Sequence, residues 1–151
     1  MLKRTISLAV AFVLCTELYA QNNSNISSVA APGDPMWVIL NHVKADKRAQ
    51  FEKYVYEVLL PALEKNAESD PISRNIIKQT RMLEPSRANK DSSYTYIWVM
   101  DPLVRKANYS YKKIISGVHS PKETEKYLSM MGECLVGPQV SYLVKQGRFG
   151  N

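Results

Sequence analysis

The chain has 151 residues, of which 45% are hydrophobic and 23% are charged, and its formal charge at neutral pH is +6. This length and balance are typical of one globular domain and exclude a collagen-like, fully disordered or multi-spanning membrane protein. Basic residues are interspersed with acidic ones rather than gathered in a stripe, so we expect an anion-attracting surface and no nucleic-acid partner.

The first twenty residues have the pattern of a cleavable leader. Lys3 and Arg4 precede an uncharged run over residues 5–16, which is shorter than the roughly 20 residues of a membrane-spanning helix. Ala20 suits a cleavage site on its carboxyl side. We therefore expect residues 1–20 to be a signal peptide, the protein to be periplasmic or secreted, and no membrane association to remain once the leader is removed.

Cleavage would shorten the chain from 151 to 131 residues and, with Lys3, Arg4 and Glu17 lost, change the formal charge from +6 to +5. Cys134 would then be the only cysteine, so the domain would have no internal disulfide and would fold on its hydrophobic core. Cys134 lies in a helical pattern and is expected to be a small core residue. Lipid attachment at Cys15 is a minor alternative.

Residues 21–35 are rich in Asn, Ser, Ala, Gly and Pro and have no apolar period, which predicts a flexible linker before a domain over residues 36–151. Residues 37–43 are almost all apolar and predict a strand buried on both faces. Asp46 is expected to cap the helix that follows. The apolar positions of that helix recur every three or four residues, as in one buried helical face; they are Phe51, Val55, Val58, Leu59, Ala62 and Leu63.

Pro61 lies inside this helical pattern. A proline there removes one backbone hydrogen bond and crowds the preceding turn, so we expect a kink near residues 57–61 and fraying by Ser69. Two strands are predicted next, over residues 75–83 and 94–100, because polarity alternates in both. The segment between them has the composition of a hairpin loop, which favours antiparallel pairing.

Asp101 and Pro102 predict the start of an amphipathic helix that ends before Gly117. Its expected apolar stripe comprises Leu103, Ala107, Tyr111, Ile114, Ile115 and Val118. Ser120 and Glu123 form a predicted capping box for a further helix through Leu135. The expected buried side of that helix comprises Tyr127, Met131, Cys134 and Leu135.

Alternation over residues 140–145 predicts a last strand. The element order is then strand, helix, strand, strand, helix with an extra helix, strand. This order predicts an α+β fold of the ferredoxin-like split βαβ type, an antiparallel sheet with the helices on one face. The other face would carry large apolar side chains into water, so we expect a homodimer that buries it.

The chain resembles the dimeric α+β barrel superfamily in two places. These are residues 37–44 running into residues 48–52, and residues 94–100 running into the next helix. This superfamily includes cofactor-free quinol and antibiotic-biosynthesis monooxygenases and small haem-degrading enzymes. The resemblance covers about residues 36–146 by element order. It implies a ligand cavity between sheet and helices in each subunit, with the sheets of two subunits closing into a barrel.

The resemblance also implies a small organic substrate, such as a quinol or phenol, and no cofactor. The implied catalytic candidates are Asn41, His42 and Trp98, and the implied ligand-binding ones are Tyr96, Tyr109 and His119. A histidine can act as a general base near neutral pH, and an Asn amide can hold an oxyanion. Asn41 and His42 are adjacent in a strand, so only one of them can face a given cavity.

The haem-degrading branch pairs an Asn on the first strand with a Trp and a His ten residues apart on the second helix. Asn41, Tyr109 and His119 have this spacing, but Tyr replaces Trp and Tyr109 would lie away from the apolar stripe. Two other interpretations stay open. The same fold could serve as a non-catalytic binding protein, and the aromatic residues of the 94–100 strand could be core or dimer interface.

Other chemistries lack their motifs. The sequence has two His and two Cys and neither a Cys-x-x-Cys nor a His-Glu-x-x-His pattern, so no zinc site is expected within the chain. It has no glycine-rich phosphate loop and no Gly-x-Ser-x-Gly, which leaves nucleotide-dependent and serine-hydrolase activities without support.

Overall fold

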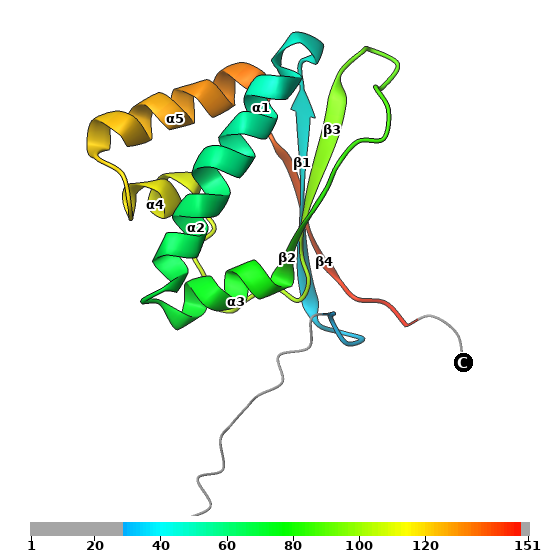
Figure 1. Ribbon diagram of the computed structural model, residues 1–151. Helices are drawn as coiled ribbons and strands as arrows, with labels where there is room; N and C mark the ends of the chain where they lie inside the picture. The colour runs from blue at the N-terminus through cyan, green and yellow to red at the C-terminus, as the bar shows by residue number, and fades with distance from the viewer. Residues whose placement is uncertain (1–28, 149–151) are drawn as a thin grey trace, which may run out of the picture.

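A computed structural model describes residues 29–148 as an antiparallel sheet with helices packed on one side of it (Figure 1). The strands are β1 (Pro35–Val43), β2 (Thr80–Leu83), β3 (Tyr94–Met100) and β4 (Val140–Lys145). The helices are α1 (Arg48–Tyr54), α2 (Leu60–Ala67), α3 (Pro71–Gln79), α4 (Tyr111–Ser116) and α5 (Pro121–Cys134), with short turns η1 (Ala45–Lys47) and η2 (Val55–Leu59).

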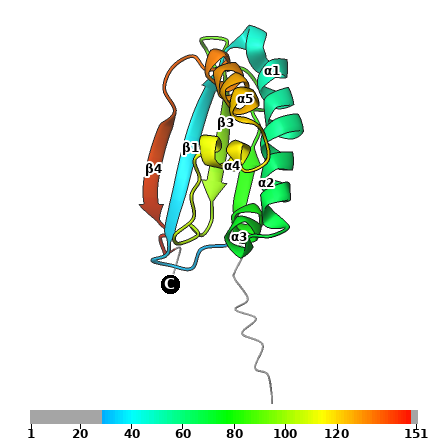
Figure 2. The same ribbon diagram turned by 90° about the vertical axis from the view of Figure 1, so that its left-hand side faces the viewer.

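The strand order is β2-β3-β1-β4, and every neighbouring pair is antiparallel. This is the ferredoxin-like order, so the predicted fold class is confirmed, as is the hairpin between β2 and β3. Figure 2 looks through the helices onto the sheet and shows that β4 forms an edge with no helix above it.

The register of β1 separates two faces of the sheet. Ile39, Asn41 and Val43 are buried under the helices, whereas Val38 and Leu40 point to the other face and are only half-buried. The prediction that both faces of this strand are buried is therefore wrong for the single chain, because the helices pack on one side of the sheet.

The core lies between the sheet and the helices. In β3, Tyr96 and Trp98 face the helices and are buried, and the ring of Tyr96 packs on Phe51 of α1 with 4.7 Å between centroids. Cys134 is fully buried in α5, as predicted for a small core residue. Tyr96 and Trp98, which alternate with half-buried residues along β3, are thus core residues.

The predicted disturbance before Pro61 takes the form of the π-helical turn η2, which joins α1 to α2. Because Pro61 has no backbone N–H, the chain widens here, and the Leu60 N–H donates to the carbonyl of Val55, five residues earlier. The predicted N-cap at Asp46 is wrong. Asp46 lies inside η1, and α1 begins at Arg48 with no side-chain cap.

The predicted strand over residues 75–83 is wrong in its first half, which belongs to helix α3. Asp70 accepts hydrogen bonds from the N–H groups of Ile72 and Ser73, and Pro71 is the first helical residue. This strong helix start outweighs the weak alternation in polarity, and the strand β2 begins only at Thr80.

The helix predicted to start at Asp101 and Pro102 is also wrong over residues 102–110, because α4 begins only at Tyr111. Asp101 uses its carboxylate to accept from the Ala30 N–H and from Arg81 instead of capping a helix. Lys106 has a φ of 63°, which no right-handed helix accommodates. The apolar side chains of this segment still pack against the core, which explains the amphipathic pattern.

The predicted capping box of α5 is confirmed. Ser120 Oγ accepts from the Glu123 N–H, and the Glu123 carboxylate accepts from the Ser120 N–H. Hydrogen bonds from Ser120 are the main cause that lowers the pKa of the Glu123 carboxyl. The helix ends with Cys134, one residue before the predicted end.

The expected signal peptide and the first part of the expected linker, residues 21–28, lie outside the described residues. In the rest of that linker, Ala30 is 6% exposed and its N–H donates a hydrogen bond to the Asp101 carboxylate. The Gly33 N–H donates a 2.9 Å hydrogen bond to the Gln146 carbonyl. This part of the segment therefore packs on the domain. Within the described part of the chain, no helix has the length and apolar character needed to cross a membrane.

Candidate functional site

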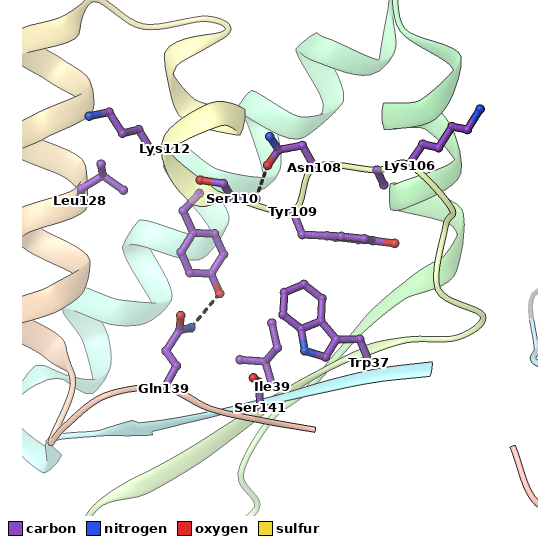
Figure 3. A pocket seen from close by; sticks show the side chains of 12 residues that line it. Trp37, Ile39, Lys106, Asn108, Tyr109, Ser110, Lys112, Leu128, Gln139 and Ser141 are labelled. Atoms are coloured by element: carbon purple, nitrogen blue, oxygen red, sulfur yellow. Dashed lines mark hydrogen bonds between the residues drawn. The ribbon is translucent and has the colours of Figure 1, made fainter. Parts of the chain in front are cut away.

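A cleft of about 910 Å³ lies between the β1–β4 edge of the sheet, the segment before α4, and α5. Figure 3 shows the side chains that surround it. They are Trp37, Ile39, Lys106, Ala107, Asn108, Tyr109, Ser110, Tyr111, Lys112, Leu128, Gln139 and Ser141. The cleft lies on the helix-covered side of the sheet, because its β1 residues share a face with buried Asn41.

Two aromatic rings form one wall of the cleft. Trp37 of β1 and Tyr109 of the segment before α4 have ring centroids 5.6 Å apart and planes inclined by 77°, an edge-to-face contact. The Tyr109 hydroxyl accepts a hydrogen bond of 3.0 Å from the Val104 N–H, which fixes its ring. Burial raises the pKa of Tyr109, so its phenol stays neutral. This wall suits the face or edge of a planar aromatic ligand.

A polar cluster lies at the inner end of the cleft. The Gln139 side-chain amide donates to Asn41 Oδ1 at 2.5 Å and to the Tyr111 hydroxyl at 3.2 Å. Asn41 is fully buried, and its Nδ2 donor has no hydrogen-bond partner. Burial raises the pKa of Tyr111, while the hydrogen bond from Gln139 opposes the shift. Both hydrogens of the Gln139 amide are engaged, so the neutral hydroxyl of Tyr111 is the donor of this cluster that can approach a ligand oxygen.

The charge of the cleft is positive. Lys106 and Lys112 line it, and the twelve lining residues include no carboxylate and no histidine. Lys112 also lies 3.8 Å from Glu125, but both side chains are more than two-thirds exposed, so this ion pair is weak. An anionic or electron-rich oxygen is therefore favoured in the cleft over a cation.

The structure separates the candidates predicted from the first strand. Asn41 points toward the helices behind Gln139 and Tyr111, whereas His42 points to the uncovered face, where its Nδ1 lies 3.0 Å from Thr95 Oγ1. The prediction that only one of the two can face a given cavity is confirmed. Neither of them lines the cleft, but Asn41 lies behind it and accepts a hydrogen bond from Gln139.

Tyr96 and Trp98 do not line the cleft, although both face the same side of the sheet. The Tyr96 hydroxyl donates to Glu52 Oε1 at 2.5 Å, and Arg48 Nε donates to the same oxygen at 2.9 Å. The hydrogen bond from Tyr96, followed by that from Arg48, lowers the pKa of Glu52. Tyr96 is thus a buried partner of a surface ion pair.

Tyr109 and His119 are not on one helix, which corrects the geometry predicted for them. Tyr109 precedes α4 and lines the cleft, whereas His119 follows α4 and packs on the ring of Tyr127 with 5.0 Å between centroids. Since Asn41, Tyr109 and His119 do not meet at the cleft, the residues do not fit the haem arrangement. Among the described residues, no group of three or more His, Cys, Asp or Glu side chains could hold a metal ion.

Sequence reasoning missed three central residues of the cleft: Trp37, Tyr111 and Gln139. Trp37 could have been found, because it lies four residues before Asn41 in the same strand and so shares its face. Tyr111 was assigned to a core stripe. Gln139 carries no sequence signal, since it joins the cluster only because the residue after it begins β4 beside β1.

No protein-family model matches the chain, and no curated protein matches it. Among solved structures, a putative antibiotic biosynthesis monooxygenase from Caulobacter crescentus CB15 is similar over 78% of this chain and 92% of its own length. The sequence identity is 14% and the TM-score is 0.40, a distant likeness from which no reaction follows.

Proposed function

We propose that the protein binds a planar aromatic molecule with a phenolic or anionic oxygen in the cleft. The observation that carries this proposal is that an aromatic wall, Trp37 with Tyr109, stands beside the neutral phenol of Tyr111, to which Gln139 donates a hydrogen bond. The wall accounts for the ring, and the Tyr111 hydroxyl and the lysines account for the oxygen.

Cofactor-free oxidation of a bound quinol by molecular oxygen is the second candidate. The amide of Asn41 and the phenol of Tyr111 favour it, because such donors can hold an oxyanion. The lining residues provide neither a histidine nor a carboxylate to take the substrate proton, so ligand binding has the better support.

The experiment uses the fact that the protein has two tryptophans. Trp37 lines the cleft and Trp98 does not, so the Trp98→Phe variant makes Trp37 the single indole reporter. Titration with a panel of quinols and anthrone-like phenols should quench its fluorescence saturably. Tyr111→Phe should weaken binding by about tenfold, the value of one hydrogen bond to a charged or electron-rich oxygen.

Tyr142→Phe is the matched control, since Tyr142 is exposed on the far side of the sheet. It should leave the titration unchanged. If no member of the panel quenches Trp37 saturably, or if both Tyr variants weaken binding equally, the cleft is not the binding site. Oxygen uptake in the same samples would identify an oxidase, and its absence would leave a binding protein.

We propose further that a second copy of the chain covers the bare face of the sheet. This face carries a continuous apolar surface; its residues are Met36, Val38, Leu40, Leu83, Ile97, Val99, Val140, Tyr142 and Val144. Several are more than a third exposed, as is unusual for so many large apolar side chains on one face. A self-complementary pairing of two sheets would bury them.

We also propose export, on the leader pattern of residues 1–20. Mass spectrometry of the protein purified from its native cells should give a chain that begins at Gln21. An intact N-terminus on the mature protein would contradict export by a cleaved leader.

A further inference from the structure

A second hollow lies between the helices α2 and α3 and the β2–β3 hairpin, and we call it the Trp98 pocket. Its volume is about 300 Å³. The residues that line it are Tyr56, Leu60, Leu63, Glu64, Ile77, Thr80, Met82 and Trp98. It shares no lining residue with the cleft, so a ligand here would occupy a separate site.

A small cavity of about 40 Å³ continues inward from the Trp98 pocket. The two hollows share Leu60, Leu63, Thr80 and Trp98, which form the partition between them. The remaining wall of the inner cavity is apolar apart from two tyrosines. Its size suits one small polar head, such as a single oxygen with its attached carbon, and not a ring.

The partition contains two unpaired polar atoms. Trp98 is 6% exposed, and neither its Nε1 donor nor the Thr80 hydroxyl has a hydrogen-bond partner. Thr80 and Trp98 lie on adjacent strands and both face the helices, since Met82 pairs with Trp98 and follows Thr80 by two residues. Leaving a buried donor unpaired costs about 1–3 kcal/mol, so such a pair of atoms needs an explanation.

The rim of the pocket disfavours an anionic ligand. Glu64 is exposed at the rim, and Tyr56 donates a hydrogen bond to the nearby Glu84. That hydrogen bond is the main cause that raises the pKa of Tyr56 to about 12. The phenol therefore stays neutral and engaged, while the carboxylates repel an anionic ligand.

We propose that the Trp98 pocket binds an uncharged aliphatic molecule whose one oxygen enters the inner cavity and pairs with Trp98 Nε1 and Thr80 Oγ1. An alcohol or ketone oxygen can accept from both donors. The aliphatic chain lies against Leu60, Leu63 and Ile77. Leu60 is half-buried, and its side chain moves aside as the oxygen passes the partition. This proposal does not rest on the function proposed for the cleft, although the inner cavity shares Ile39, Tyr109 and Tyr111 with the cleft.

The test is a titration with hexanol, read by thermal shift and by the fluorescence of Trp98 in a Trp37→Phe background. Hexanol should bind saturably and raise the melting temperature, and hexanoate should not. Thr80→Val removes the hydroxyl at nearly constant shape, so it should weaken hexanol binding by about tenfold. The same variant should leave the ligand-free protein as stable or more stable, because an unpaired hydroxyl is lost.

Thr124→Val is the matched control. Thr124 is 2% exposed and its hydroxyl is likewise unpaired, but it does not line the Trp98 pocket. It should not change hexanol binding. Equal binding of hexanol and hexanoate, no saturable response, or a Thr80→Val variant that binds hexanol as tightly as the parent would overturn the proposal. Quenching of Trp37 in the Trp98→Phe protein would assign the alcohol to the cleft and would also overturn it.

Discussion

Asn41 and His42 are neighbours in β1, yet the pleat of the strand sends their side chains to opposite faces of the sheet. Asn41 joins the polar cluster behind the cleft, and His42 bonds to Thr95 on the bare face. Two adjacent polar residues that both looked catalytic in the sequence therefore have different surroundings. This difference can be measured.

Asn41→Ala should weaken the binding of a quinol in the cleft by about tenfold, because the Gln139 amide loses its hydrogen-bond acceptor. Any oxygen uptake that depends on this binding should fall by the same factor. His42→Ala should change either quantity by about twofold or less. Fluorescence titration and an oxygen electrode measure both effects. Equal losses in the two variants, with both proteins folded, would contradict the separation of the two faces.

Glu52 offers a second residue-scale prediction through its pKa. Hydrogen bonds from Tyr96 and Arg48 lower this pKa below its usual value of 4.5. A carboxyl whose folded-state pKa is lowered stabilises the fold above its usual pKa, and this stability is lost as the pH falls through the folded value. Tyr96→Phe should thus raise the pKa of Glu52 and destabilise the protein at pH 7 by about 1 kcal/mol.

Urea denaturation at pH 7 and at pH 2, with the Glu52 titration followed by NMR, checks this prediction. The loss in Tyr96→Phe should shrink as the pH falls through the lowered folded-state pKa of Glu52. Tyr142→Phe removes an exposed hydroxyl and is the control. An unchanged Glu52 titration in Tyr96→Phe would contradict the prediction, because it would mean that the hydrogen bond from Tyr96 does not lower the pKa of Glu52.

Among the elements of the fold, the strands β1, β3 and β4 and the helix α5 could be predicted, because each has a strong local signal. A continuous apolar run identifies β1, alternation identifies β3 and β4, and the Ser120 capping box identifies the helix. The segment before α4 could not be predicted. Its apolar residues have a helical spacing, but the backbone there is irregular and their side chains still pack on the core. Asp101, at the start of this segment, accepts a hydrogen bond from the Ala30 N–H. The wall of the cleft was missed for this reason.

Ser120→Ala should destabilise the protein by about 1 kcal/mol, because the first turn of α5 loses the acceptor for the Glu123 N–H. Thermal unfolding should show a melting temperature lower by about 4 °C. Ser129→Ala, at an exposed position inside the same helix, should be neutral or slightly stabilising because alanine favours the helix. The capping role fails if the two variants unfold at the same temperature.

The whole molecule is a two-layer structure with one bare face. Helices cover one side of the sheet (Figure 1), and most residues of the other side are apolar and partly exposed. The sequence predicted this asymmetry from the element order, since two strand-helix-strand units place both helices on one face. The size and lining of the cleft could not be predicted, because residues from β1, the segment before α4, α5 and the region of β4 form it together.

Adjacent residues of β4 test the proposed dimer. Tyr142 lies on the bare face and Leu143 on the other, and both are more than half exposed. Tyr142→Glu should convert a dimer into a monomer at micromolar concentration, because it would bury an unpaired charge between two sheets. Leu143→Glu should leave the dimer intact. Analytical ultracentrifugation distinguishes the cases, and a parent protein that sediments as a monomer would contradict the pairing.

The central claim is that the cleft between Trp37, Tyr109 and Tyr111 is the ligand site, and a crystal structure of the protein with a bound quinol from the panel tests it most directly. The ring should lie against Trp37 and Tyr109, with an oxygen within hydrogen-bonding distance of the Tyr111 hydroxyl. A quinol found only on the bare face of the sheet or in the Trp98 pocket, with the cleft empty, would contradict the claim.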